Sequence, residues 1–178
     1  MLRLFVGIEF PPELKLRLSL LQSGIAGAKW VDPGNFHLTL RFIGEVDEGT
    51  AADVDEALLR LKARPFTLLL AGTGTFGGDK PRQLWVGTER EPALSALQGK
   101  VEQALIRARL PPEPRKFTPH VTLARLRDPR RGEIHDFLAS HAQFRAAPLK
   151  VERFSLIASY PTKAGSVYED QADYELIG

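Results

Sequence analysis

The chain has 178 residues, of which 43% are hydrophobic and 26% charged, and this length and composition predict one globular domain with a sizeable core. Its net charge of +2 is compatible with an anionic ligand but does not identify one. The absence of cysteine excludes disulfides, thiolate nucleophiles and cysteine-based zinc sites. No apolar stretch is long enough to span a membrane, and the first residues lack the features of a signal peptide, so a cytoplasmic protein is the simplest expectation.

The first half of the chain predicts alternating strands and helices. Leu14, Leu18 and Leu21 recur at helical spacing behind a proline pair, and shorter apolar runs between glycine or proline residues have the composition of strands. The expected strands are 2–9, 29–31, 36–42 and 65–71, and the expected helices are 12–25 and 51–62. The glycine-rich segment 72–81 is expected to be a loop.

The start of the chain recurs after residue 80. LFVGIEFPPEL at 4–14 aligns without gaps to LWVGTEREPAL at 84–94, with six of eleven positions identical. A helix at 94–109 follows the second copy, then a second His-x-Thr-Leu strand, a helix near 131–139 and strands near 143–159 and 166–177. Such a duplication predicts a single α+β domain over 1–178: a duplicated two-lobe αβ unit, the lobes being roughly 1–80 and 81–178 by sequence. Its two antiparallel sheets, with helices outside, would surround a central cleft.

Each copy carries a histidine two residues before a threonine, in HLTL at 37–40 and HVTL at 120–123. Residues i and i+2 of a strand share a face, so His37 projects beside Thr39 and His120 beside Thr122. The alternative is a structural role, in which each histidine only forms a hydrogen bond and was inherited with its strand. Matching positions within a duplicated unit favour a shared function instead.

Two facing imidazoles suit a reaction that needs one base and one acid near neutral pH. Threonine hydroxyls between them would donate hydrogen bonds to anionic oxygens, which favours a phosphate-like substrate. Metal binding is the rival chemistry for two histidines, but it usually needs a third ligand, and neither motif has an aspartate or glutamate at strand spacing. No metal is therefore expected.

These motifs and their surroundings resemble the 2H phosphoesterase superfamily, and most closely its LigT-like RNA 2′,3′-cyclic phosphodiesterase branch. The resemblance rests on FVGIE at 5–9, KWVDPGNFHLTLRFIGE at 29–45 and RKFTPHVTLAR at 115–125, and it covers nearly the whole chain. It implies an enzyme without metal or cofactor that opens a ribose 2′,3′-cyclic phosphate on RNA ends and leaves a 2′-phosphate. Relatives in this branch also join or cleave 2′-5′ RNA linkages.

The resemblance also implies roles for the motif residues. His120 would be the base that activates water, and His37 the acid that protonates the leaving 3′-oxygen. Thr39 and Thr122 would donate to the non-bridging phosphate oxygens. The near-symmetric repeat itself does not distinguish acid from base.

Three further residues are candidates for substrate contacts. The family uses the arginine that ends HVTLAR, here Arg125, to hold phosphate, but strict alternation places Arg125 opposite His120, so this role requires a strand end or a bulge. Arg41 is expected on the face of His37 and is an independent phosphate candidate; its alternative role is that of a surface arginine. Phe76, in the glycine-rich segment, is a candidate for stacking on a base.

Two other functions remain open from the sequence. One is a phosphodiesterase for a small cyclic nucleotide or a 2′-5′ oligoadenylate, and the other is a non-catalytic protein that binds RNA ends. Eight basic residues between 107 and 131 favour a polymer over a small nucleotide. The expected partner is RNA with a 2′,3′-cyclic phosphate end, with no membrane association, and the expected state is a monomer.

Overall fold

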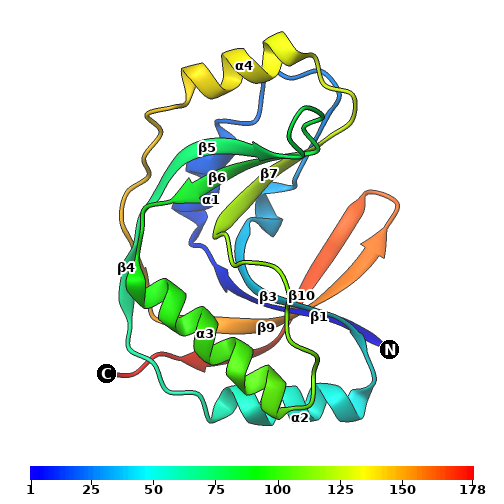
Figure 1. Cartoon of the computed structure of the whole chain (residues 1–178), viewed down its shortest axis with the longest axis vertical. Coiled ribbons are helices and arrows are strands. Elements are labelled where there is room, and N and C mark those ends of the chain that lie inside the picture. Colours follow the sequence, from blue (N-terminus) through cyan, green and yellow to red (C-terminus); the bar gives the residue numbers. More distant parts are fainter.

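The computed structural model describes residues 1–178 as four α-helices and ten strands (Figure 1). The helices are α1 (Pro12–Ser19), α2 (Glu48–Leu59), α3 (Pro92–Arg107) and α4 (Arg131–Ser140). The strands are β1 (Leu2–Glu9), β2 (Ala28–Trp30), β3 (His37–Val46), β4 (Phe66–Leu68), β5 (Leu70–Phe76), β6 (Gln83–Thr88), β7 (His120–Leu126), β8 (Leu149–Val151), β9 (Arg153–Thr162) and β10 (Gly165–Glu175). None of the helices is both long and apolar enough to cross a membrane.

The strands form two four-stranded antiparallel sheets and one two-stranded ladder. Sheet A has the order β10-β9-β1-β3, sheet B has the order β2-β7-β6-β5, and β4 pairs with β8. The triplets β9-β1-β3 and β5-β6-β7 are equivalent, because the repeated segments supply β1 and β6 and the histidine motifs supply β3 and β7. The expected duplicated α+β architecture is confirmed.

The spatial lobes differ from the two halves of the sequence. β2 and β5 precede residue 80 but belong to sheet B, whereas β9 and β10 come from the C-terminal part and belong to sheet A. This exchange of strands ties the sheets into one unit. The hairpin of β9 and β10 projects at one side of the molecule (Figure 1).

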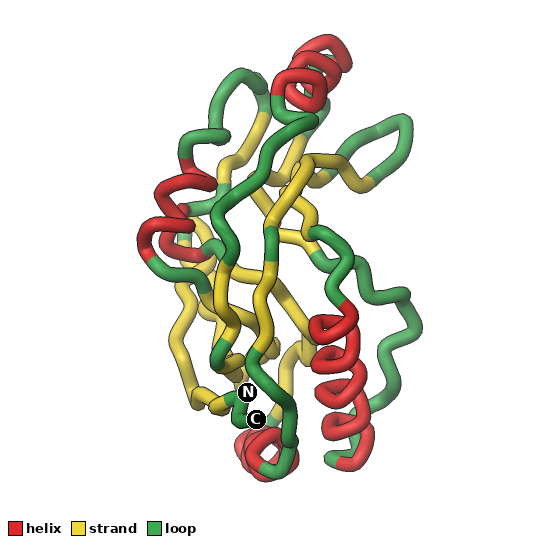
Figure 2. Tube along the Cα trace, turned by 90° about the vertical axis from the view of Figure 1, so that its left-hand side faces the viewer, coloured by secondary structure: helices red, strands yellow, loops and turns green.

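The core lies between the sheets and the outer helices, which surround the strands in Figure 2. In β1, Leu4, Val6 and Ile8 are at most 2% exposed, so alternation places Arg3, Phe5, Gly7 and Glu9 on the other face. In β6, Leu84 and Val86 are fully buried in the same way. Each sheet therefore uses one face for the core and leaves the other for a site.

Two expected elements have different limits. The helix expected over 12–25 ends at Ser19, although Leu14, Leu18 and Leu21 are buried as predicted. The first half of the glycine-rich segment, 72–76, belongs to the strand β5, and only its second half, 77–81, is a loop as expected. The glycine content of β5 has a packing reason: the indole of Trp85 lies against Gly74 of the neighbouring strand, and a Cβ on Gly74 would be 2.3 Å from the ring.

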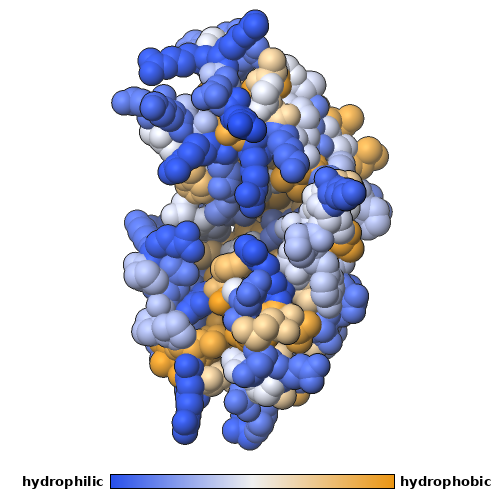
Figure 3. All heavy atoms as spheres, turned by 90° about the vertical axis from the view of Figure 1, so that its right-hand side faces the viewer, coloured by the Kyte–Doolittle hydropathy of each residue, from blue (hydrophilic) through white to orange (hydrophobic).

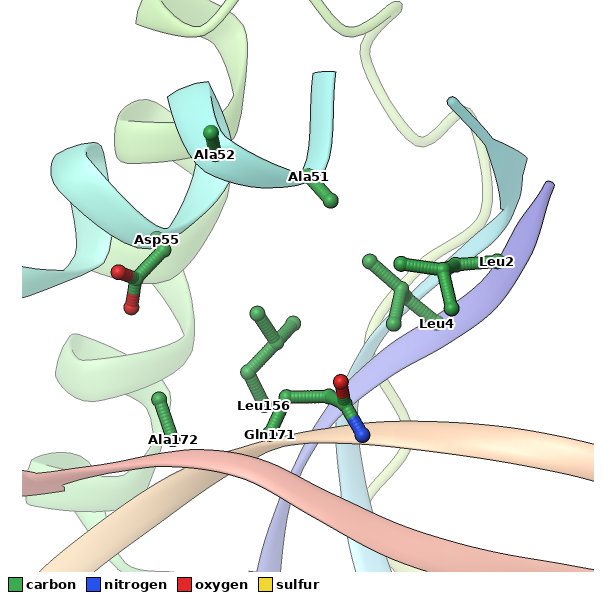
Figure 4. A pocket seen from close by; sticks show the side chains of 8 residues that line it. All are labelled: Leu2, Leu4, Ala51, Ala52, Asp55, Leu156, Gln171 and Ala172. Carbon is green, nitrogen blue, oxygen red and sulfur yellow. The ribbon is translucent and has the colours of Figure 1, made fainter. Parts of the chain in front are cut away.

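A cavity of about 200 Å³ lies between α2 and the core face of sheet A (Figure 4). Leu4, Leu156 and Ala51 are among its mostly apolar lining residues, and the Asp55 carboxylate nearby accepts a hydrogen bond from the Tyr174 hydroxyl at 2.6 Å. Leu4 lies on the face of β1 opposite Gly7 and Glu9, which pair with Thr39 and His37 of β3, so this cavity lies behind the sheet and away from the histidines.

Candidate active site

The two histidines lie on β3 and β7, which contact each other where sheets A and B meet. His37 Nδ1 donates to the carbonyl of Asn35 at 2.8 Å, and His120 Nδ1 donates to the carbonyl of Thr118 at 2.7 Å. A carbonyl only accepts, so each neutral ring carries its lone pair on Nε2. Both rings therefore present the same nitrogen, in the same tautomer, for proton transfer.

Each motif strand has a β-bulge at the leucine that follows its threonine. On β3, Thr39 pairs with Gly7 and Arg41 with Val6, which leaves Leu40 as the extra residue. On β7, Thr122 pairs with Trp85 and Ala124 with Leu84, and here the extra residue is Leu123. A bulge inverts the alternation of faces beyond it, so the residue three positions after each threonine returns to the histidine face.

The bulge on β7 resolves the position of Arg125. Arg125 is exposed on the face of His120 and Thr122, whereas Ala124 is fully buried. Its positive charge also lowers the pKa of Tyr168, which burial otherwise raises, so Arg125 lies near that tyrosine of sheet A. Because Tyr168 in turn contacts the His37 ring at 5.3 Å between centroids, Arg125 faces the space between the two motifs.

The bulge on β3 shows that the expectation for Arg41 was wrong. Arg41 is only 7% exposed and points away from the His37 face, while Phe42 takes the position equivalent to Arg125 and is 40% exposed. Its guanidinium binds both carboxylate oxygens of Glu102 on α3, at 3.1 and 3.2 Å, and the carbonyls of Phe42 and Pro111. Arg41 therefore joins β3 to α3 and is not available to a substrate.

Gln83 is a site residue that the motifs do not reveal. Its amide nitrogen lies 2.5 Å from Thr122 Oγ1 and 3.3 Å from His120 Nε2. In the other lobe the aligned residue is Arg3, and there His37 Nε2 accepts a hydrogen bond from Thr39 Oγ1 at 2.8 Å instead. Gln83 reaches Thr122 only because β6 pairs with β7. The one sign of this in the sequence is that Gln83 directly precedes the repeated segment that forms β6.

Aromatic rings enclose both imidazoles. The Phe5 and Tyr168 rings lie 4.6 and 5.3 Å from the His37 ring. On the other side, the Phe76 ring meets the His120 ring edge-on at 4.9 Å and packs against Trp85 at 5.4 Å. Phe76 is thus a partly buried residue at the end of β5 and not part of an exposed loop as expected.

Burial lowers the pKa of both histidines below their ordinary value of 6.5. For His37, the charges of His120 and Lys15 lower the pKa further, against the hydrogen bond to Asn35, which raises it. For His120, the hydrogen bond to Thr118 opposes the effect of burial. Both shifts therefore favour the neutral imidazole in the free protein.

One group of carboxylates has the spacing of a metal site. Glu9, Asp170 and Asp173 offer oxygens within 4.8 Å of one another, and all three residues are exposed. Neither histidine belongs to this group, although Glu9 is the cross-strand partner of His37. Partial burial of its carboxylate raises the pKa of Glu9 to about 7, and the hydrogen bond and negative charge of Asp170 raise it too.

The model of the LigT-like phosphoesterase family matches residues 8–85 and 86–168, one match for each repeat. The RNA 2′,3′-cyclic phosphodiesterase of Aeropyrum pernix is 35% identical over 158 residues, covering 87% of this chain and 89% of the relative. The enzyme of the same name from Thermotoga maritima is 32% identical over 177 residues, covering 94% and 92%.

Solved structures show the same fold. A protein from Thermus thermophilus aligns with a TM-score of 0.78 and 30% identity, over 99% of this chain and 98% of its own. Escherichia coli LigT in complex with 3′-AMP aligns with a TM-score of 0.82 and 24% identity, over 99% of both chains. The resemblance drawn from the motifs is confirmed: the chain belongs to the LigT-like phosphoesterases of the 2H phosphoesterase superfamily.

Proposed function

We propose that the protein hydrolyses the 2′,3′-cyclic phosphate at RNA ends to a 2′-phosphate, by acid–base catalysis between His37 and His120. The observation that carries the proposal is the pair of equivalent His-Thr sites on two contacting strands, each with an imidazole Nε2 lone pair directed away from its backbone anchor. The names of the relatives support the substrate.

His120 acts as the base in this mechanism. Its Nε2 lone pair takes a proton from water as the water oxygen attacks phosphorus. The bond from phosphorus to O3′ breaks, and protonated His37 gives its Nε2 proton to O3′, which becomes the 3′-hydroxyl. The phosphate remains on O2′, and the two histidines have exchanged protonation states by the end of the turnover.

Three side chains bind the phosphate. Thr39 and Thr122 donate their hydroxyl protons to the non-bridging oxygens, and Arg125 neutralises the negative charge that develops there. Thr122 is already prepared for this role, because Gln83 donates to its oxygen and leaves its proton free. Thr39 must release His37 Nε2 first, which a bound phosphate achieves by offering a stronger acceptor.

Two finer proposals use the same site. A 5′-hydroxyl in place of water would yield a 2′-5′ RNA linkage through the same two histidines, which is the ligase reaction. Phe76 is the proposed contact for the base nearest His120, because its ring lies beside that imidazole and is partly exposed.

The deciding experiment incubates the protein, in EDTA, with an oligoribonucleotide that ends in 2′,3′-cyclic phosphate, and identifies the product isomer. A 2′-phosphate is expected. His37→Ala and His120→Ala should each lower kcat by about a hundredfold or more, as expected for loss of a general acid or base. His135→Ala is the matched control, because His135 is exposed on α4. Unchanged substrate, or turnover that requires added metal, would contradict the proposal.

A small-nucleotide substrate is the second candidate. Escherichia coli LigT, which shares this fold, has been crystallised with 3′-AMP, with NADP+ and with ATP. A higher kcat/KM for cyclic mononucleotides or 2′-5′ oligoadenylates than for RNA ends would favour this candidate. A protein that binds RNA ends without any turnover would correspond to the non-catalytic alternative.

The lowered histidine pKa values predict an acidic pH optimum. The profile of kcat/KM reports the free enzyme, so its bell should have its maximum below pH 6.5. A bound phosphate stabilises the imidazolium forms and raises both pKa values, so the kcat bell should lie at higher pH. Steady-state rates between pH 4.5 and 9 check both profiles. A kcat/KM maximum above pH 7 would mean that burial does not determine the pKa values of the two histidines.

A further inference from the structure

Two cations face each other across neighbouring strands beside the site. Arg125 of β7 is the direct cross-strand partner of Lys29 of β2, and on its other side Arg125 pairs with Gln83. Cross-strand partners share a face, so Lys29 lies on the site face of sheet B. The burial of β2 agrees, because Lys29 is exposed while Trp30 packs against Phe137 of α4 on the other face.

Neither cation has a carboxylate partner. Like charges directly opposite each other in a sheet are destabilising. The pair therefore weakens the local structure unless an anion lies between the ammonium group of Lys29 and the guanidinium group of Arg125. Because the proposed function assigns Arg125 to the reacting phosphate, Lys29 on its far side remains available for a further negative charge of the ligand.

Arg127 extends this pair along β7. Its N–H donates to the carbonyl of Gly27 at 3.2 Å, so the pairing with the β2 segment continues past the end of the strand. The alternation of buried and exposed residues continues as well: Leu126 is buried and Arg127 is exposed, without an ion pair. Arg127 thus lies on the face of Arg125, about 7 Å further from the histidines.

Two others of the eight basic residues between 107 and 131 have carboxylate partners. Arg115 pairs with Glu113 and Arg130 with Glu133, and Arg107 lies in the last turn of α3. Figure 3 shows long hydrophilic side chains gathered over one end of the face that it presents, above a hollow in the middle of that face.

We propose that Lys29 and Arg127, together with Arg125, form a binding path for the phosphodiester backbone of single-stranded RNA, so that the nucleotides upstream of the reacting end lie along sheet B. This inference rests on the proposed function for the location of the reacting end. It makes a chain of several nucleotides, and not a mononucleotide, the preferred ligand. Each phosphate contact made by these cations releases bound counterions, so the affinity must depend on salt.

The test measures binding without turnover. A 5′-fluorescein hexauridylate that ends in a 2′-phosphate is titrated with wild-type protein and with Lys29→Gln and Arg127→Gln, by fluorescence anisotropy at increasing KCl. Each variant should weaken binding several-fold at low salt and reduce the slope of log K against log salt by about 0.7, the value for one single-strand phosphate. The loss of affinity for uridine 2′-monophosphate, measured by calorimetry, should be much smaller.

Lys62→Gln is the control, because Lys62 is an exposed lysine beyond α2, near the ladder of β4 and β8, and makes no ion pair. Equal slopes for wild type and both variants would overturn the path, as would an equal loss in Lys62→Gln, which would mean a general charge effect. The outcome is independent of catalysis: a hexamer that binds with the expected slopes but whose cyclic-phosphate form is not hydrolysed would keep the path and refute the proposed function.

Discussion

At the scale of single residues, the two halves of the site differ in what binds the threonine. Thr39 donates to its own histidine, whereas Thr122 accepts from Gln83 and keeps its proton for another acceptor. Both imidazole rings donate from Nδ1 to the carbonyl two residues before the histidine. Gln83 is therefore one of the side chains that make the duplicated site asymmetric, and the proposed mechanism, with one acid and one base, requires such a difference.

Replacing Gln83 by glutamate tests this role. In Gln83→Glu, a carboxylate beside His120 Nε2 stabilises the imidazolium, so the pKa of His120 should rise and that of His37 should change less. The negative charge should also repel the substrate phosphate and lower kcat/KM by at least tenfold. NMR titration of the histidine ring protons and steady-state kinetics measure the two effects.

Two further variants separate positioning from general structure. Gln143→Glu adds the same charge at an exposed residue beyond α4 and should leave both histidines unchanged. Gln83→Met keeps the length of the side chain without its donor, and should lower kcat without raising the pKa of His120. An unchanged His120 titration in Gln83→Glu would remove Gln83 from the site.

Arg41 provides the opposite case, a conspicuous charge with a structural role. Arg41→Leu leaves Glu102 largely buried without its partner, which typically destabilises a protein by about 3–5 kcal/mol. The double variant Arg41→Leu/Glu102→Leu should regain much of that loss. Urea denaturation measures the stabilities, and KM for the RNA substrate, measured where each variant is folded, should stay within about twofold. A tenfold rise in KM would restore Arg41 as a phosphate contact.

At the scale of elements, the bulge decides which motif residues serve the site. Alternation in a strand correctly predicts that His37 and Thr39, or His120 and Thr122, share a face, because these residues precede the bulge. It fails for Arg41 because the extra leucine inverts the faces beyond it.

The remaining misassignments have similar causes. The sequence HLTLRF does not indicate a bulge, because the extra residue, Leu40, is not a glycine. The strand expected over 65–71 stops short of the end of β5 because the following glycines indicate a loop, whereas Gly74 accommodates the indole of Trp85. Gln83 was missed because its contact depends on the register between two strands, which one sequence does not contain. The duplication, the fold class and the motif pair are predictable because the order of residues along one chain contains them, without any register between strands.

The glycine that both repeats share has an element-level test. A Cβ on Gly7 would lie 3.0 Å from the carbonyl oxygen of Leu38 and 3.5 Å from the His37 ring. Gly7→Ala should therefore displace β3, lower kcat at least tenfold and destabilise the protein by about 1–3 kcal/mol. Enzyme kinetics and thermal denaturation measure both. A normal kcat in a correctly folded variant would show that β3 accommodates the added methyl group without displacing His37.

Gly99→Ala is the matched control for this substitution. Gly99 lies inside α3, where a Cβ would meet nothing within 4 Å. Alanine is favoured over glycine in a helix by about 1 kcal/mol, so this variant should be more stable than wild type and fully active.

At the scale of the whole molecule, the two sheets differ in the charges that lie beside their histidines. Near His37, the carboxylates of Glu9 and Asp170 lie with the cation of Lys15, whereas sheet B has the cations Arg125 and Lys29 without a carboxylate partner. In the proposed function, this difference favours an RNA backbone on the side of sheet B. The charges therefore distinguish the two sides of the site for an approaching RNA chain, which the symmetry of the fold alone does not do.

The same carboxylates give the stability of the protein a defined pH dependence. Glu9 has a pKa of about 7 in the folded protein against an ordinary 4.5, so between these values the folded state binds more protons than the unfolded state. The stabilisation from this proton is complete below pH 4.5 and is lost as the pH rises to 7. The histidines act oppositely: their lowered pKa values remove stability as the pH falls below 6.5.

Replacing Glu9 by glutamine separates the two effects. Glu9→Gln abolishes the charge next to Asp170, so its melting temperature should exceed that of wild type at pH 8, and the difference should vanish near pH 4.5. The gain is moderated by solvent, because Glu9 is exposed. Glu175→Gln, at the far end of β10, is the control and should show no such trend. Calorimetric scans at both pH values measure the difference. If the Glu9→Gln advantage were the same at pH 4.5 and pH 8, proton uptake by Glu9 would not be its cause, and the pH dependence would have to come from the histidines alone.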